Sequence, residues 1–152
     1  MILKVQIVRY VDDHFPGWVE CEFFDAENYH HTIMEKVPVV SEEWFGPDSG
    51  YPQEGGLRCE ILGRWRDVDG RDLVRITIEE PDHVETTEGV TEFVVLSSQV
   101  ISAEATISQL EKQVAKYEDK AQIEPKRASA LLHNAKICRE RIVNLRNGYW
   151  KS

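Results

Sequence analysis

The last third of the chain carries a seven-residue repeat of apolar side chains, and this repeat limits what the chain can fold into. One row of the repeat reads Ile107, Val114, Ala121, Ala128, Ala135, Ile142 and Tyr149. The companion row reads Leu110, Tyr117, Glu124, Leu131, Cys138 and Leu145, and Glu124 is its one polar interruption. A lone helix cannot bury such a stripe, so the repeat requires a partner helix.

Residues 102–149 are predicted to form two helices. Ser102 is a suitable N-cap, and the first helix is expected to run to about Lys120. Pro125 would cost about 3 kcal/mol inside a continuous helix but suits the first turn of a new one, which is expected to end at Asn147. The sequence therefore favours an antiparallel hairpin. A single kinked helix is the alternative, because the heptad register continues unbroken through the proline.

Residues 1–101 alternate polar and apolar side chains in six short runs that are separated by turns. This pattern, with no helical period, is typical of an antiparallel barrel or sandwich. We expect an α+β fold with a six-stranded antiparallel β-barrel over 1–101 and a coiled-coil-like helical hairpin over 102–152. The predicted barrel core consists of Leu3, Val5, Ile7, Val19, Cys21, Phe23, Leu57, Cys59, Ile61, Val74, Ile76, Ile78, Phe93 and Val95.

Composition and targeting signals favour a cytoplasmic protein. Of the 152 residues, 41% are hydrophobic and 30% are charged, which is ordinary for a soluble globular chain. No run reaches the roughly 20 apolar residues of a membrane-spanning helix, and the N-terminus lacks the features of a signal peptide. The three cysteines lie far apart within apolar patterns, so they are predicted to be buried thiols without a disulfide framework.

Charge is divided unevenly along the chain, whose net charge is −9. Residues 1–101 contain 8 Lys and Arg against 21 Asp and Glu, a balance of −13. Residues 102–152 contain 10 basic against 6 acidic residues, a balance of +4. The acidic body makes nucleic acid an unlikely partner and favours a basic one, whereas the basic second helix is expected to present a solvated face or to contact the acidic barrel.

Several segments of the first hundred residues carry a family resemblance. They are residues 35–40, Tyr51-Pro52 with Cys59, and Thr86-Thr87-Glu88-Gly89 before residues 93–95. These segments resemble a group of small bacterial β proteins that are similar to the β-barrel domains of translation elongation factors such as elongation factor Tu. The resemblance covers at most residues 1–100 and consists of turn and core residues. It implies a barrel and no active site.

The irregular segment 41–56 is the candidate partner-binding loop, because long loops in compact domains are often functional. Its aromatic residues Trp44, Phe45 and Tyr51 are the types that dominate binding hot spots. The alternative is that these side chains cap the open end of the barrel. The loop acids could perform acid–base chemistry as a carboxylate pair, but nothing fixes their separation, and solvated loop acids are far commoner.

Residues for other chemistry are not arranged in recognisable patterns. His30 and His31 are adjacent, so on a strand they point to opposite faces and do not readily share a metal ion. Cys138 lies on the apolar seam, where a core role is expected rather than that of a nucleophile. We therefore predict no catalytic residues, no metal site and no cofactor.

The sequence predicts a non-enzymatic cytosolic protein-binding module of bacterial type, such as an acidic immunity-type partner that neutralises a basic protein. One alternative is an assembly protein that forms a homodimer through its helices; another is a translation-factor-like protein associated with RNA or the ribosome. The predicted seam and oligomer residues are Ile107, Leu110, Val114, Tyr117, Leu131, Leu132, Cys138, Ile142 and Leu145.

Overall fold

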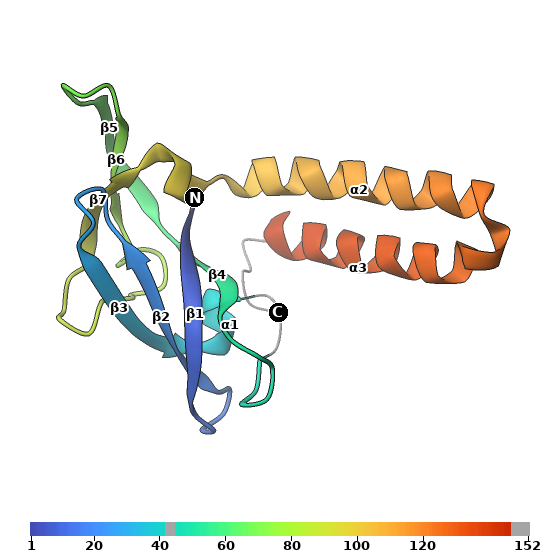
Figure 1. The fold of residues 1–152 in the computed structure, drawn as a ribbon, viewed down its shortest axis with the longest axis horizontal. Coiled ribbons are helices and arrows are strands. Elements are labelled where there is room, and N and C mark those ends of the chain that lie inside the picture. The colour runs from blue at the N-terminus through green and yellow to red at the C-terminus, as the bar shows by residue number, and fades with distance from the viewer. Residues whose placement is uncertain (42–44, 147–152) are drawn as a thin grey trace. The chain divides into compact units, whose positions relative to one another are not determined.

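The computed structural model describes residues 1–41 and 45–146 (Figure 1). Contacts divide these residues into two compact units, a β unit over Met1–Ile101 and a helical unit that begins at Ser102. The fold is α+β with antiparallel sheets, as the sequence predicts.

The first sheet is built around the N-terminal strand β1. Alternating apolar residues make β1 an eleven-residue strand, and it pairs antiparallel with three other strands. The sheet order is β3-β2-β1-β4, and β8 pairs with the first two residues of β1. The strands span Ile2–Asp12 (β1), Trp18–Phe24 (β2), His30–Lys36 (β3), Gln53–Arg58 (β4) and Val100–Ile101 (β8).

The second sheet has the order β5-β6-β7. Its strands span Glu60–Arg66 (β5), Asp72–Thr77 (β6) and Glu92–Leu96 (β7). The β5–β6 turn ends on Gly70, whose φ of +82° explains why glycine follows the two aspartates there. Two short helices complete the β unit, α1 (Val37–Val40) after β3 and η1 (Ser97–Gln99) before β8.

The prediction of a six-stranded closed barrel is wrong: among the described residues the β unit has eight strands in two sheets that do not close into a barrel. One predicted strand is divided at Cys59, whose N–H donates to the carbonyl of Met1 (2.9 Å) where the chain passes from one sheet to the other. On the opposite side, single backbone hydrogen bonds, Ala26 N to Val94 O and Thr87 N to Thr32 O (both 2.9 Å), stand in place of a strand ladder.

The core between the sheets follows the predicted alternation. Thirteen of the fourteen predicted core residues are buried, and Ile61 is partly buried against them. The predicted core omitted several buried apolar residues, most of which lie outside the long strands. These are Ile33, Val37, Val39, Val40, Phe45, Val84 and Val100, which all belong to the same core.

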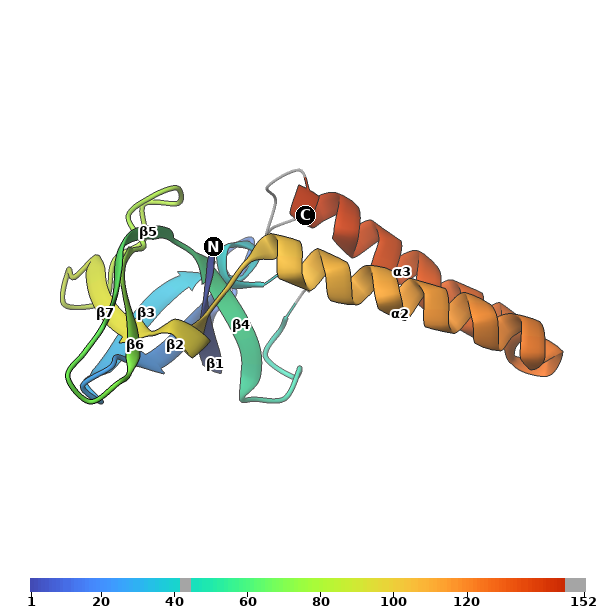
Figure 2. The same ribbon diagram turned by 90° about the horizontal axis from the view of Figure 1, so that it is seen from above.

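The helical unit consists of α2 (Ala103–Ile123), the short turn η2 (Pro125–Arg127) and α3 (Ala128–Arg146). The Ser102 hydroxyl accepts a hydrogen bond from the N–H of Ala105 (3.0 Å), as expected of an N-cap. The helices lie side by side in the hairpin arrangement rather than as one kinked helix (Figures 1 and 2). Within the described part of the chain, every helix is too short or too polar to span a bilayer.

Apolar seam residues of the two helices face each other. Leu110 and Ala121 of α2 are buried, and α3 buries Leu131, Ala135, Cys138, Ile142 and Leu145. The predicted seam residues Ile107, Val114 and Tyr117 are half-buried, whereas Leu132 lies off the seam and is 48% exposed. The seam is thus largely satisfied within one chain.

Gly55 on β4 lies where the backbone leaves no room for a side chain. A Cβ at this position would stand 2.9 Å from the side chain of Ile7 and 2.9 Å from the carbonyl oxygen of Val40. The sequence analysis placed this glycine in the irregular segment 41–56. It is a strand residue, because Gly55 pairs with Val5 of β1.

The Gly55→Ala substitution is expected to destabilise the β unit by about 1–3 kcal/mol, because the added methyl group overpacks the Ile7 and Val40 contacts. The measurement is the free energy of unfolding in urea. Gly63→Ala on β5 is the matched control, since nothing lies within 4 Å of a Cβ there. Equal stability of the two variants would contradict the close approach at Gly55.

Candidate interaction site: an acidic corner of the β unit

The turn between β2 and β3 is organised by the carboxylate of Asp25. Asp25 Oδ1 accepts from the backbone N–H groups of Glu27 (2.9 Å) and Tyr29 (3.1 Å), and the Asp25 N–H donates to the Tyr29 carbonyl (3.0 Å). Asn28 takes a positive φ of 62°, which asparagine tolerates better than most residues. The conformation of the turn is therefore fixed by hydrogen bonds within residues 25–29.

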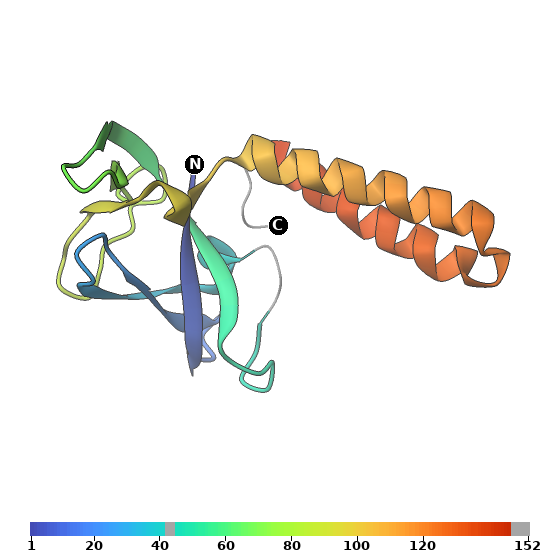
Figure 3. The ribbon, with the colours of Figure 1, turned by 45° about the horizontal axis from the view of Figure 1, so that its top comes forward.

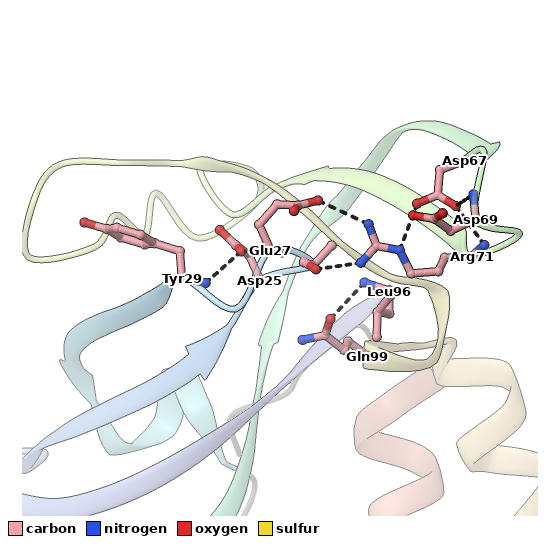
Figure 4. A network of polar contacts seen from close by, with 9 residues as sticks. Asp25, Glu27, Tyr29, Asp67, Asp69, Arg71, Leu96 and Gln99 are labelled. Atoms are coloured by element: carbon pink, nitrogen blue, oxygen red, sulfur yellow. Dashed lines mark hydrogen bonds and ion pairs between the residues drawn. The ribbon is translucent and has the colours of Figure 1, made fainter.

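Arg71 ties this turn to the second sheet (Figure 4). Its guanidinium donates to Asp67 Oδ2 (2.8 Å) at the β5–β6 turn, to the Ala26 carbonyl (2.8 Å) and to Glu27 Oε1 (3.2 Å). Gln99 adds a second tie, because its side-chain amide donates to the Phe24 carbonyl (2.6 Å). The β2–β3 turn is consequently anchored to both sheets.

His31 closes the inner side of the turn. Its Nε2 donates to Asp25 Oδ2 (2.9 Å), and its ring stacks on Phe23 and meets the edge of Phe93, with centroids 5.0 and 4.6 Å apart. Burial by itself would raise the pKa of Asp25, but the hydrogen bonds from His31 and from the N–H groups of Tyr29 and Glu27 outweigh it and lower the pKa.

The loop between β6 and β7 runs beside this turn and is held in place by its own contacts (Figures 1 and 3). Val84 and Thr86 are buried, and their N–H groups donate to the carbonyls of Ile78 (3.2 Å) and Val90 (2.9 Å). The N–H of Thr87 donates to Thr32 of β3 (2.9 Å). A loop with these anchors presents its outward side chains in a fixed arrangement.

The outward side chains of the loop are predominantly acidic. Residues 79–92 contain six Asp and Glu and no Lys or Arg. Asp82 pairs with Arg58, and Glu92 lies 3.6 Å from Arg75. The other four are the exposed residues Glu79, Glu80, Glu85 and Glu88. We name the turn 25–29 together with the loop 79–92 the acidic corner.

Two exposed aromatic side chains lie at the acidic corner. Tyr29 is 53% exposed and its hydroxyl donates to Glu88 (3.4 Å). Phe24, 49% exposed, stacks near His30, which in turn contacts Glu22 (2.7 Å). This site is not among the residues predicted from the sequence, where the partner-binding loop was placed at 41–56. The run of acids without a basic residue was the available signal.

The predicted partner-binding residues lie elsewhere in the β unit. Phe45 is 5% exposed in the core, and Tyr51 is half-buried against the core with its hydroxyl donating to the Gly46 carbonyl (2.7 Å). Trp44 lies outside the described residues. Phe45 packs into the core, and a contact role for this loop stays a prediction that the burial of Phe45 does not favour.

The cysteines are buried and carry free thiols. Burial raises the pKa of the Cys21 thiol to about 12 and that of Cys59 to about 11. Such thiols are not thiolates at neutral pH, so neither is suited to act as a nucleophile. In residues 1–41 and 45–146 no three His, Cys, Asp or Glu side chains are grouped so that they could hold a metal ion.

The Asp25→Asn substitution is expected to lower the free energy of unfolding by about 1–2 kcal/mol at pH 7, because it removes charge-assisted hydrogen bonds. A carboxyl whose pKa is lower in the folded state contributes stability that is complete above its ordinary value of 3.8 and is lost as the pH falls through the folded pKa. The difference from wild type should therefore disappear in acid. Urea titrations from pH 7 to pH 2 measure it, with exposed Asp48→Asn as control.

In a Cys138→Ala variant, the two remaining thiols are expected to resist a thiol reagent at pH 8 while the protein is folded. Their raised pKa values and burial leave almost no accessible thiolate. Reagent absorbance measures the rate, and full reaction in urea is the positive control. Reaction of the folded variant at the rate of a free thiol would contradict the burial.

No protein-family model, curated protein or solved structure matches the chain. The β unit presents exposed carboxylates and aromatic rings on an anchored turn and an anchored loop.

Proposed function

We propose that the chain is a non-enzymatic protein-binding module whose acidic corner binds a basic segment of a partner protein. The observation that carries this proposal is the loop 79–92, which holds four exposed carboxylates on a backbone fixed by buried Val84 and Thr86. An anchored loop loses little conformational freedom on binding, so more of the interaction energy is retained as affinity.

Charge supplies attraction over a distance. The β unit carries a balance of −13, and six of its acids lie in fourteen consecutive residues. A one-sign surface of this kind steers an oppositely charged partner and raises its association rate, an effect that falls as salt screens the field beyond roughly 10 Å. The proposed partner is therefore basic.

The aromatic rings add a contact that carboxylates alone do not provide. Tyr29 stands next to Glu88, so a Lys or Arg of the partner could place its charge over the ring and still meet a carboxylate. Arginine suits both contacts, because its planar guanidinium stacks and forms paired hydrogen bonds. An immunity-type role, in which this surface neutralises a basic protein, is the specific form of the proposal.

Association with RNA or the ribosome ranks lower. It would use the basic residues of α3, but Arg139 and Arg146 are already engaged with Glu118 and Glu111 of α2. The acidic β unit also opposes phosphate binding.

Self-association through the helices is the second function we propose. The seam is filled within one chain, yet α3 still exposes Leu132, Ile137 and Val143, at 48, 44 and 53%. These three side chains lie off the seam, so a homodimer would use an outer flank of the helical unit. Leu132 is the one of them that the sequence predicts as an oligomer residue.

The acidic corner is tested by Glu80→Lys with Glu85→Lys. A partner captured from native cytosol and identified by mass spectrometry is purified, and its dissociation constant is measured by calorimetry at two salt concentrations. The corner variant is expected to weaken binding by about tenfold or more, because like charges then face the basic partner.

The matched control is Glu54→Lys with Glu60→Lys, which makes the same change of charge at exposed acids outside the corner. It should retain affinity within about threefold, the change expected of rim charges. Equal loss in both variants would assign the binding to net charge and not to the corner. Capture of no partner would end the protein-binding proposal.

A further inference from the structure

One flank of the helical unit has a shallow groove between α2 and α3. The groove is lined by Glu111, Val114, Arg139, Ile142, Val143 and Arg146. Its floor is apolar, because Val114 and Ile142 belong to the seam and Val143 adjoins them. Leu132 stands on the same face of α3, since it precedes Arg139 by seven residues, or two helical turns.

The rims of the groove carry opposite charges on opposite helices. On α2 the rim residues are Glu111 and Glu118, and on α3 they are Arg146 and Arg139. Each acid pairs with the arginine at its own level along the hairpin, Glu111 with Arg146 and Glu118 with Arg139. This flank is therefore charge-balanced, with one sign on each helix.

The other flank differs in charge. By heptad position it contains Lys116 and Lys120 of α2 and Asn134 of α3, with no acid at the corresponding positions. Two copies that met through this flank would bring like charges together, which is unfavourable. Electrostatics therefore distinguishes the two flanks.

We infer that the groove flank is the surface through which two copies of the chain pair, as a four-helix bundle; this inference rests on the proposed self-association. A two-fold axis parallel to the helices places α2 of one copy beside α3 of the other. This rotation does not change the position of any residue along the helix axes. Glu111 then faces Arg146 of the second copy, and Glu118 faces Arg139 of the second copy. The contact is isologous, as two-fold pairing requires.

The other two-fold arrangement, with its axis across the helices, places α2 on α2. Glutamates would then face glutamates and arginines would face arginines, so charge selects the first arrangement. In that arrangement Val143 and Leu132 enter the contact with the groove floor, which removes exposed apolar surface from water. Antiparallel neighbours with apolar inner positions are the usual organisation of such bundles.

The test measures the mass of the full-length chain by sedimentation, across a range of protein concentrations. Val143→Asp is expected to raise the dimer dissociation constant at least about 30-fold, because it places an unpaired charge among the apolar residues of the groove. Ile137→Asp is the matched control on the other flank: it is a comparably exposed branched apolar residue of α3 and should leave the dimer intact. Far-UV circular dichroism shows that both variants keep their helices.

A charge exchange tests whether the groove flank carries the contact. A variant with Arg139→Glu and Arg146→Glu has four acids on the flank, and a variant with Glu111→Lys and Glu118→Lys has four basic residues. Each alone is expected to be monomeric, and an equimolar mixture should form a heterodimer, since every facing pair is again opposite in sign. Simple structural damage would not be repaired by mixing.

The outcomes separate the two proposals. A wild-type chain that stays monomeric at high concentration would overturn self-association as a whole. A wild-type dimer that persists in Val143→Asp, or a mixture that does not restore pairing, would overturn the groove flank and leave self-association standing. A dimer lost in Val143→Asp, kept in Ile137→Asp and restored by mixing is the expected result.

Discussion

One cation joins the two sheets of the β unit at its acidic corner, beside the backbone hydrogen bonds of Ala26 and Thr87. Arg71 donates to Asp67, to the carbonyl of Ala26 and to Glu27, so a single side chain joins the β5–β6 turn of one sheet to the β2–β3 turn of the other. Because the sheets do not close into a barrel, such side-chain links hold the two sheets together where a closed barrel would have paired strands. The position of the Tyr29 ring follows from the same turn, since Asp25 fixes the Tyr29 backbone.

The same link controls the electrostatics of the corner. Arg71 neutralises Asp67 and lies 3.2 Å from Glu27, so the inner acids are compensated. Glu80 and Glu85 on the neighbouring loop have no ion pair among the described residues. The negative field is therefore concentrated on the outer side of the corner, where a partner would arrive. The inner acids hold the turns in place, and the outer acids are exposed.

Local periodicity was sufficient to predict most of the β core, because a half-buried strand records its orientation in every second residue. It could not predict closure, since closure depends on whether distant strands meet. Cys59 looks like the middle of one strand, yet its N–H bonds to Met1 and divides that strand between two sheets. Gly55 looks like part of a loop, yet it is a strand residue whose missing side chain admits Ile7 and the Val40 carbonyl.

The candidate site was harder to predict than the fold. Aromatic residues in a long irregular segment suggested a contact loop, but periodicity carries no information on the depth of a loop residue, and Phe45 is buried. The composition of the acidic loop showed a run of carboxylates, but it did not show the conformation in which the loop holds them. Its fixed shape comes from Val84 and Thr86, two residues that no strand or helix pattern marks as core.

The heptad repeat predicts that two helices pair, but it does not predict whether two copies of the chain pair. Its residues predict that two helices meet, and within this chain they do, so of the seam only the groove floor at Val114 and Ile142 faces a second copy. What remains for assembly is the pattern beside the seam, where acids lie on α2 and arginines on α3. A single hairpin satisfies these charges once, at the exposed edge where each pair contributes little. A second copy would bury the same groups, and pairing stabilises the dimer only where the interchain ion pairs and the covered apolar floor exceed the desolvation cost. Charge order along the flank, rather than the seam, therefore decides how two such hairpins could fit together.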